Sequence, residues 1–204
     1  MVLDSYRAIA DRILIPASMP FMRINPNTIS SFSLILAALT GIFFYLGGLW
    51  MFASFFTLLL SALFDAIDGK VARLRNIASK RGDLIDHVYD RYADIFILLG
   101  FIFSPFAQLS VGLIAVIGVL VTSYLGVQSQ ALGLKRNYSG LLGRADRLIF
   151  MLVFILLQFF IHAQATVYGL LLTPINVLLI WFAVAGNVTA IKRFKDTYDG
   201  LGSS

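Results

Sequence analysis

Residues 65–90 read DAIDGKVARLRNIASKRGDLIDHVYD, and the rest of the chain is arranged around them. The stretch places four aspartates at the inner ends of two strongly apolar segments: Asp65, Asp68, Asp86 and Asp90. In a helix, residues three or four positions apart project from the same face. If both flanks are helical, each aspartate pair therefore shares a face. We predict two helices that meet at a cluster of four carboxylates.

The four aspartates are candidate ligands of a metal ion. Carboxylates so close together repel one another unless cations lie among them, and oxygen ligands favour hard divalent ions such as Mg²⁺ or Mn²⁺. The alternative is that the two pairs only cap or solvate helix ends. It is disfavoured because polar groups at membrane depth are costly unless they have a use. Asp94, one turn beyond the cluster, is expected to be its neighbour or the partner of an arginine.

The composition is that of a membrane protein with several spans. Of the 204 residues, 59% are apolar and 13% are charged, with a mean hydropathy of +0.85. An ordinary soluble domain is about half apolar and about a quarter charged. The absence of cysteine excludes disulfides, thiolate catalysis and sulfur-ligated metals. We expect one membrane-embedded domain over residues 1–204, with no nucleic-acid partner.

Six apolar segments predict an all-α integral membrane fold, a six-helix bundle over residues 28–195. About twenty helical residues cross a hydrocarbon layer of ~30 Å. Asn27 is the expected N-cap of the first helix. Residues 1–16 alternate apolar and charged side chains, which predicts a juxtamembrane amphipathic helix in the membrane interface or, alternatively, a helix packed on the bundle. The expected spans are 28–47, 50–75, 82–103, 108–132, 147–163 and 168–191.

The cations give an independent check of this count. All sixteen Lys and Arg residues fall on one side of a six-helix arrangement, because the turns near residues 48, 105 and 165 carry none. By the positive-inside rule that side faces the cytoplasm. We therefore expect a multi-pass protein of the plasma membrane, with the aspartate cluster and both termini on the cytoplasmic side.

Eight residues of the opening stretch keep a characteristic spacing: Asp65-x2-Asp68-Gly69-x2-Ala72-Arg73-x8-Gly82-x3-Asp86-x3-Asp90. This pattern resembles the signature of the CDP-alcohol phosphotransferases, integral membrane enzymes that make phospholipids. All eight signature positions match, which is far more specific than a short glycine motif. The resemblance implies a CDP-lipid donor, an alcohol acceptor, release of CMP, and a homodimer.

The same resemblance implies roles for individual residues. Asp65, Asp68 and Asp86 would hold two Mg²⁺ or Mn²⁺ ions that polarise the diphosphate. Asp90 would remove the acceptor's proton and would also contact one metal. Contacts to CDP would come from residues around the aspartates: Asn27, Asp68, Gly69, Ala72, Arg73 and Gly82. The alternative for the small residues is close helix packing, and for the arginine an ion pair within its helix.

A basic stretch, residues 135–147, bears on the acceptor. Arg144 and Arg147 share a helix face, and with Lys135 and Arg193 they could form a pocket for a phosphorylated acceptor. The alternative is that these cations anchor the protein to anionic lipid headgroups. The sequences RADR at 144–147 and QSQALG at 128–133 resemble the archaeal archaetidylinositol phosphate synthases of the family.

This second resemblance favours inositol 1-phosphate as acceptor and CDP-archaeol or CDP-diacylglycerol as donor. Glycerol 3-phosphate is the nearest alternative, because it also needs a phosphate pocket. CDP-inositol as a soluble donor, giving di-inositol phosphate, is a second alternative. A divalent-cation transporter is disfavoured, because the aspartates lie at one membrane face whereas transport sites lie near the midplane.

Overall fold

The structure, a computed structural model, describes residues 11–202. Residues 11–18 are helical and lead into the short 3-10 helix η1 (Met19–Phe21). The amphipathic helix expected at 1–16 falls mostly outside the described residues. Six long helices follow: α2 (Pro26–Leu46), α3 (Trp50–Leu74), α4 (Lys80–Ile102), α5 (Leu109–Ala131), α6 (Arg144–Phe160) and α7 (Pro174–Gly202).

One element was not predicted, a two-stranded antiparallel hairpin between α6 and α7. It pairs β1 (Ala165–Val167) with β2 (Leu170–Leu172). Its two-residue loop has φ values of 49° at Tyr168 and 78° at Gly169, as the preferred hairpin turns require. The last helix therefore begins at Pro174 and not at 168. Hydropathy alone missed the strands because a short apolar strand cannot be told from a helix segment by this measure.

Within residues 11–202, four helices are long and apolar enough to cross a membrane: α2, α3, α5 and α7. Of the other two, α4 is less apolar because it carries the charged half of the opening stretch, and α6 is short, with only 17 residues. The protein is thus a helical integral membrane protein, while the count of six spans stays a prediction.

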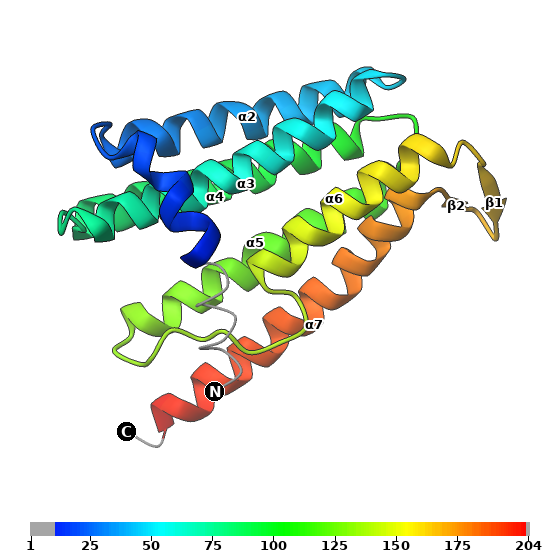
Figure 1. The fold of residues 1–204 in the computed structure, drawn as a ribbon. Coiled ribbons are helices and arrows are strands. Elements are labelled where there is room, and N and C mark those ends of the chain that lie inside the picture. Colours follow the sequence, from blue (N-terminus) through cyan, green and yellow to red (C-terminus); the bar gives the residue numbers. More distant parts are fainter. Residues whose placement is uncertain (1–10, 203–204) are drawn as a thin grey trace.

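The helices form two groups of three (Figure 1). In one group α2 packs on α3 and α4, and in the other α7 packs on α5 and α6, while contacts of α3 with α6 and of α4 with α5 join the groups. A continuous apolar core runs through both, including Phe44, Phe101 and Phe182. Where α2 crosses α4, a Cβ on Gly100 would clash with the backbone of Gly41, so this close approach requires glycine.

The two ends of the bundle differ in charge. The α2–α3 turn and the hairpin lie toward one end, while the C-terminus and the α5–α6 connection lie toward the other (Figure 1). The turns at the first end carry no Lys or Arg. This arrangement fits the expected separation of charge, and the cytoplasmic orientation of the basic end stays a prediction.

The N-terminal segment holds the basic end of α3 in place. Lys70 donates to Asp11 at 2.8 Å, and Arg75 donates to the Ile24 carbonyl at 3.0 Å. The rings of Phe21 and Phe64 meet edge to face, with their centroids 5.5 Å apart. These contacts fix the part of α3 that carries the first aspartate pair.

Candidate active site

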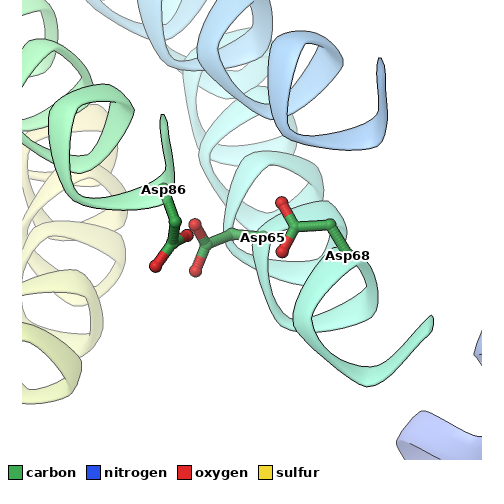
Figure 2. Close-up of side chains that lie close together, drawn as sticks. All are labelled: Asp65, Asp68 and Asp86. Atoms are coloured by element: carbon green, nitrogen blue, oxygen red, sulfur yellow. The ribbon is translucent and has the colours of Figure 1, made fainter. Parts of the chain in front are cut away.

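Three of the four predicted aspartates come together between α3 and α4. Asp65 and Asp68 lie on α3 and Asp86 lies on α4, with Asp65 between the other two (Figure 2). One oxygen from each carboxylate lies within 4.8 Å of the others. The structure thus gathers oxygen atoms from two helices at one point.

The turn between α3 and α4 sets this geometry. Asn76, which follows the C-cap residue Arg75 of α3, adopts a left-handed conformation, with φ of 55°. Ser79 then caps α4 by accepting from the Gly82 N–H at 3.2 Å. Since the turn reverses the chain in a few residues, the first turns of α4 lie beside the last turns of α3, and Asp86 faces Asp65.

The start of α2 differs in detail from the prediction. Asn25, not Asn27, is the N-cap, and its side chain accepts from the Asn27 N–H at 3.0 Å. Pro26 occupies the first helical position, where its fixed φ suits a helix start and its missing N–H is not needed. The helix therefore begins two residues earlier than the sequence suggested, at Pro26.

The donor set fits a hard divalent cation. Asp68 is 5% exposed, and its Oδ2 has no hydrogen-bond partner among the described residues. A buried, unpartnered carboxylate oxygen is unfavourable unless a cation or donor compensates it. Three carboxylates and no sulfur or imidazole ligand are typical of Mg²⁺ or Mn²⁺ sites.

A polar cleft of about 520 Å³ opens beside these carboxylates, between the start of α2, the end of α3 and the start of α4. Arg73 lines it and lies back over Gly69, one turn earlier on α3, since a Cβ added to Gly69 would lie 3.5 Å from the Arg73 Nη2. The cleft is lined by all six residues predicted to contact CDP: Asn27, Asp68, Gly69, Ala72, Arg73 and Gly82.

Asp90 is not one of the three converging carboxylates but adjoins them, in a narrow space that Asp65 and Asp86 also line. It is buried, and its Oδ1 lies 2.5 Å from Nη2 of Arg144. Arg144 also binds Asp65 through both ends of its guanidinium, with two hydrogen bonds of 3.0 Å. The structure pairs Asp90 with an arginine from α6, as it also pairs Asp65, and the predicted role of Asp90 as a fourth metal ligand stays a prediction.

Beyond Arg144 lies a cavity of about 100 Å³, here called the arginine pocket. Lys135 was predicted to belong to it but is exposed and does not line it. Residues 135–139 have no regular secondary structure, and the next residue, Arg136, lines the pocket instead. Five arginines line the pocket: Arg91, Arg136, Arg144, Arg147 and Arg193.

Two of these arginines escaped the sequence analysis. Arg91 directly follows Asp90 and could have been found by projecting α4 as a helix. Arg136 depends on tertiary contacts: its Nη1 lies 3.0 Å from the His87 Nε2, and its guanidinium lies 5.2 Å from the centroid of the Tyr138 ring. No pattern in the sequence signals those contacts.

A buried ion pair underlies the arginine pocket. Arg147 donates to Asp94 at 2.7 Å, and both side chains are about 2–3% exposed. The Nη2 of Arg91 lies 3.5 Å from the same carboxylate. Arg193 is held separately, by bonds to the carbonyls of Ser139 and Thr122 at 2.9 and 2.8 Å. Asp94 is thus the partner of an arginine, one of the two roles expected for it.

Replacing Asp94 by asparagine should destabilise the protein by about 3–5 kcal/mol, because the buried Arg147 would lose its counter-charge. Asp196→Asn is the matched control, since it changes an exposed aspartate that bonds to Ser139 at the surface. Thermal unfolding in detergent measures both variants. Equal thermal midpoints for Asp94→Asn and Asp196→Asn would show that the ion pair of Arg147 with Asp94 does not stabilise the protein.

Comparison with known proteins places this geometry in context. The family model described as CDP-alcohol phosphatidyltransferase matches residues 23–189. The chain is 32% identical over 185 residues to the archaetidylinositol phosphate synthase of Methanothermobacter thermautotrophicus, which covers 91% of this chain and 84% of that protein.

Solved structures share the fold. The phosphatidylinositol phosphate synthase of Mycobacterium tuberculosis with CDP-DAG bound gives a TM-score of 0.76 at 23% identity, covering 92% of this chain and 94% of that one. The same protein in complex with manganese and citrate gives a TM-score of 0.72 at 23% identity, covering 91% and 89%.

Proposed function

Because the chain belongs to the CDP-alcohol phosphatidyltransferase family, we propose that it transfers a phosphatidyl-type group from a CDP-lipid to inositol 1-phosphate. The observation that carries this proposal is the position of the three carboxylates between the polar cleft and the arginine pocket. One side offers room for a nucleotide and the other offers cations for a phosphate. The transferred phosphorus would lie between them.

The polar cleft is the proposed site of the CDP part of the donor. Gly69 and Ala72 lack bulky side chains, so a base or ribose can approach the helix closely, and Arg73 can pair with the diphosphate. Two Mg²⁺ or Mn²⁺ ions held by Asp65, Asp68 and Asp86 would polarise the diphosphate and stabilise the leaving CMP. The CDP-DAG and the manganese in the mycobacterial structures support this assignment.

The arginine pocket is the proposed site of the acceptor's phosphate. Guanidinium groups bind phosphate oxygens in pairs, and Arg144, Arg147 and Arg193 all line the pocket. A free alcohol such as serine or inositol would leave this charge uncompensated. The similarity to the archaetidylinositol phosphate synthase favours inositol 1-phosphate among phosphorylated acceptors.

Asp90 is the proposed general base. It lines the narrow space that also contains Asp65, Asp86 and Arg144, between the two proposed substrate sites. The acceptor hydroxyl would give its proton to the Asp90 carboxylate while its oxygen forms a bond to the phosphorus attached to the lipid alcohol. The bond from that phosphorus to the CMP oxygen breaks, and CMP leaves.

The proposal includes the cellular setting. The active site is placed at the cytoplasmic face of the plasma membrane because the aspartates, the arginines and the other cations share one end of the sequence-derived arrangement. A homodimer is proposed from the family resemblance alone.

An acceptor panel tests the function. Purified protein is incubated with Mg²⁺ and one donor, either CDP-archaeol, CDP-diacylglycerol or CDP-inositol. Each donor is tested separately with inositol 1-phosphate, glycerol 3-phosphate, serine and inositol, and CMP is measured. We expect release with inositol 1-phosphate, and a loss of about ten- to hundredfold in Arg193→Gln, since a bond between charged groups is worth about 1.5–3 kcal/mol. Lys192→Gln, the neighbouring exposed cation, is the control.

The other outcomes are equally informative. Release with glycerol 3-phosphate instead would keep the reaction and overturn the acceptor. Release only from CDP-inositol would overturn the lipid donor. Mg²⁺ flux into liposomes without CMP release from any pair of substrates would reject the enzyme in favour of a transporter.

A further inference from the structure

Arg144 lies where the two halves of the site meet. It lines the narrow space beside Asp65, Asp86 and Asp90, and it also lines the arginine pocket. It begins α6 in one helix group, while the carboxylates that it binds belong to α3 and α4 in the other. No other described residue lines both of these spaces.

Arg144 and a divalent cation need the same carboxylate. Both oxygens of Asp65 accept hydrogen bonds from Arg144, and Asp65 is also one of the three aspartates whose oxygens converge. A guanidinium at hydrogen-bond distance from a ligand repels a cation on that ligand and uses its lone pairs. Arg144 is therefore a built-in competitor for the proposed metal site.

The arginine pocket offers the Arg144 guanidinium a second position when a phosphate group occupies that pocket. Arg136 and Arg193 line that pocket without an ion pair among the described residues, so the guanidinium of Arg144 is repelled from it as long as their charges are uncompensated. A phosphate group reverses the sign of this interaction, because it provides oxygens for several guanidinium groups at once. The guanidinium of Arg144 can then leave the carboxylates of Asp65 and Asp90 and bind the phosphate.

We propose that Arg144 couples the two sites: it holds Asp65 and Asp90 until it is drawn to the phosphate of the acceptor, so that acceptor and divalent cation each strengthen the binding of the other. This inference rests on the proposed function for the identity of the two ligands. Because binding linkage is reciprocal, the two affinities change by the same factor.

The coupling has a consequence for Asp90. Its Oδ1 lies against Arg144, so this oxygen is occupied and does not face an acceptor hydroxyl as long as the ion pair persists. Transfer of Arg144 to the phosphate frees Asp90 at the moment when the acceptor hydroxyl arrives. Water that enters without the acceptor meets a base that is still paired, and this protects the CDP-lipid from hydrolysis.

Binding of Mn²⁺ to the wild-type protein in detergent tests the coupling without catalysis. The affinity is measured by titration calorimetry, alone and with saturating inositol 1-phosphate or glycerol 3-phosphate, after correction for Mn²⁺ binding to the phosphate ester itself. We expect either ester to tighten Mn²⁺ binding roughly tenfold, within the usual range of allosteric coupling. An Mn²⁺ affinity independent of both esters would overturn the proposal.

The variant Arg144→Gln separates competition from simple charge attraction. Without the ester it should bind Mn²⁺ at least about fivefold more tightly than the wild type, and the ester should change its affinity less than about twofold. Lys192→Gln removes an exposed cation and should behave as the wild type. A residue with only a structural role cannot raise metal affinity when it is removed, so weaker Mn²⁺ binding in Arg144→Gln would refute the competition.

Failure of the proposed function gives a different result. Absence of CMP release with every acceptor would reject the transfer reaction and leave the Mn²⁺ titrations to be judged separately. If Arg144→Gln does not fold, the effect of the phosphate esters on the Mn²⁺ affinity of the wild type alone decides whether the two sites are coupled.

Discussion

Replacing Asp68 by asparagine should lower the rate of CMP release by about a thousandfold or more and abolish measurable Mn²⁺ binding. Asp68 is buried and its Oδ2 has no partner among the described residues, so the proposed cation is its main source of compensation. A metal that stabilises a diphosphate contributes several kcal/mol to the transition state, and each 1.36 kcal/mol is a factor of ten in rate. Asparagine keeps the shape but not the charge.

The same variant should be at least as stable as the wild type in a chelator. Neutralising a buried carboxylate removes its desolvation cost, so the thermal midpoint should stay equal or rise while activity disappears. Asp196→Asn, at the surface, should leave both CMP release and Mn²⁺ binding unchanged. Persistent activity in Asp68→Asn would remove Asp68 from the metal site.

Asp90→Asn should separate catalysis from metal binding. Because Asp90 lies against Arg144 and outside the three-carboxylate group, its loss should leave the Mn²⁺ affinity within about threefold of the wild-type value. CMP release should nevertheless fall by about 10²- to 10⁴-fold, the usual contribution of a general base.

The ratio of the two effects is the decisive readout for Asp90. A parallel loss of Mn²⁺ binding and CMP release would make Asp90 a metal ligand, as the sequence alone suggested. A full rate of CMP release in Asp90→Asn would eliminate it as the base. Size-exclusion profiles in detergent would show that the variant keeps its fold.

Helix placement was predictable because it depends on local properties. Long apolar runs, the prolines before α2 and the small turn residues gave the six helices to within a few residues at most ends. The hairpin at 165–172 was missed because Val and Leu are as apolar in a strand as in a helix. The cap at Asn25 was missed because Asn27 offers the same side chain two residues later.

The site was predictable where it follows helix geometry and not where it follows tertiary packing. Asp65, Asp68 and Asp86 come together because helical spacing and one tight turn force them to. Arg144 depends on how α6 sits against α3 and α4, and its bonds to Asp65 and Asp90 have no signal in local sequence.

The prediction that Lys135 lines the arginine pocket, where the structure has Arg136, failed for a similar reason. The two residues are adjacent and equally basic, so composition cannot tell which one points into the arginine pocket. The conformation of the irregular segment 135–139 and the contact of Arg136 with His87 decide it.

The most direct measurement is the rate of CMP release from a CDP-lipid with inositol 1-phosphate, first in EDTA and then with Mg²⁺ or Mn²⁺ titrated back. We expect no release above background in EDTA, full recovery with either cation in the wild type, and no recovery in Asp68→Asn. Undiminished release in EDTA would contradict the assignment of the three carboxylates between α3 and α4 as the metal centre of this transferase.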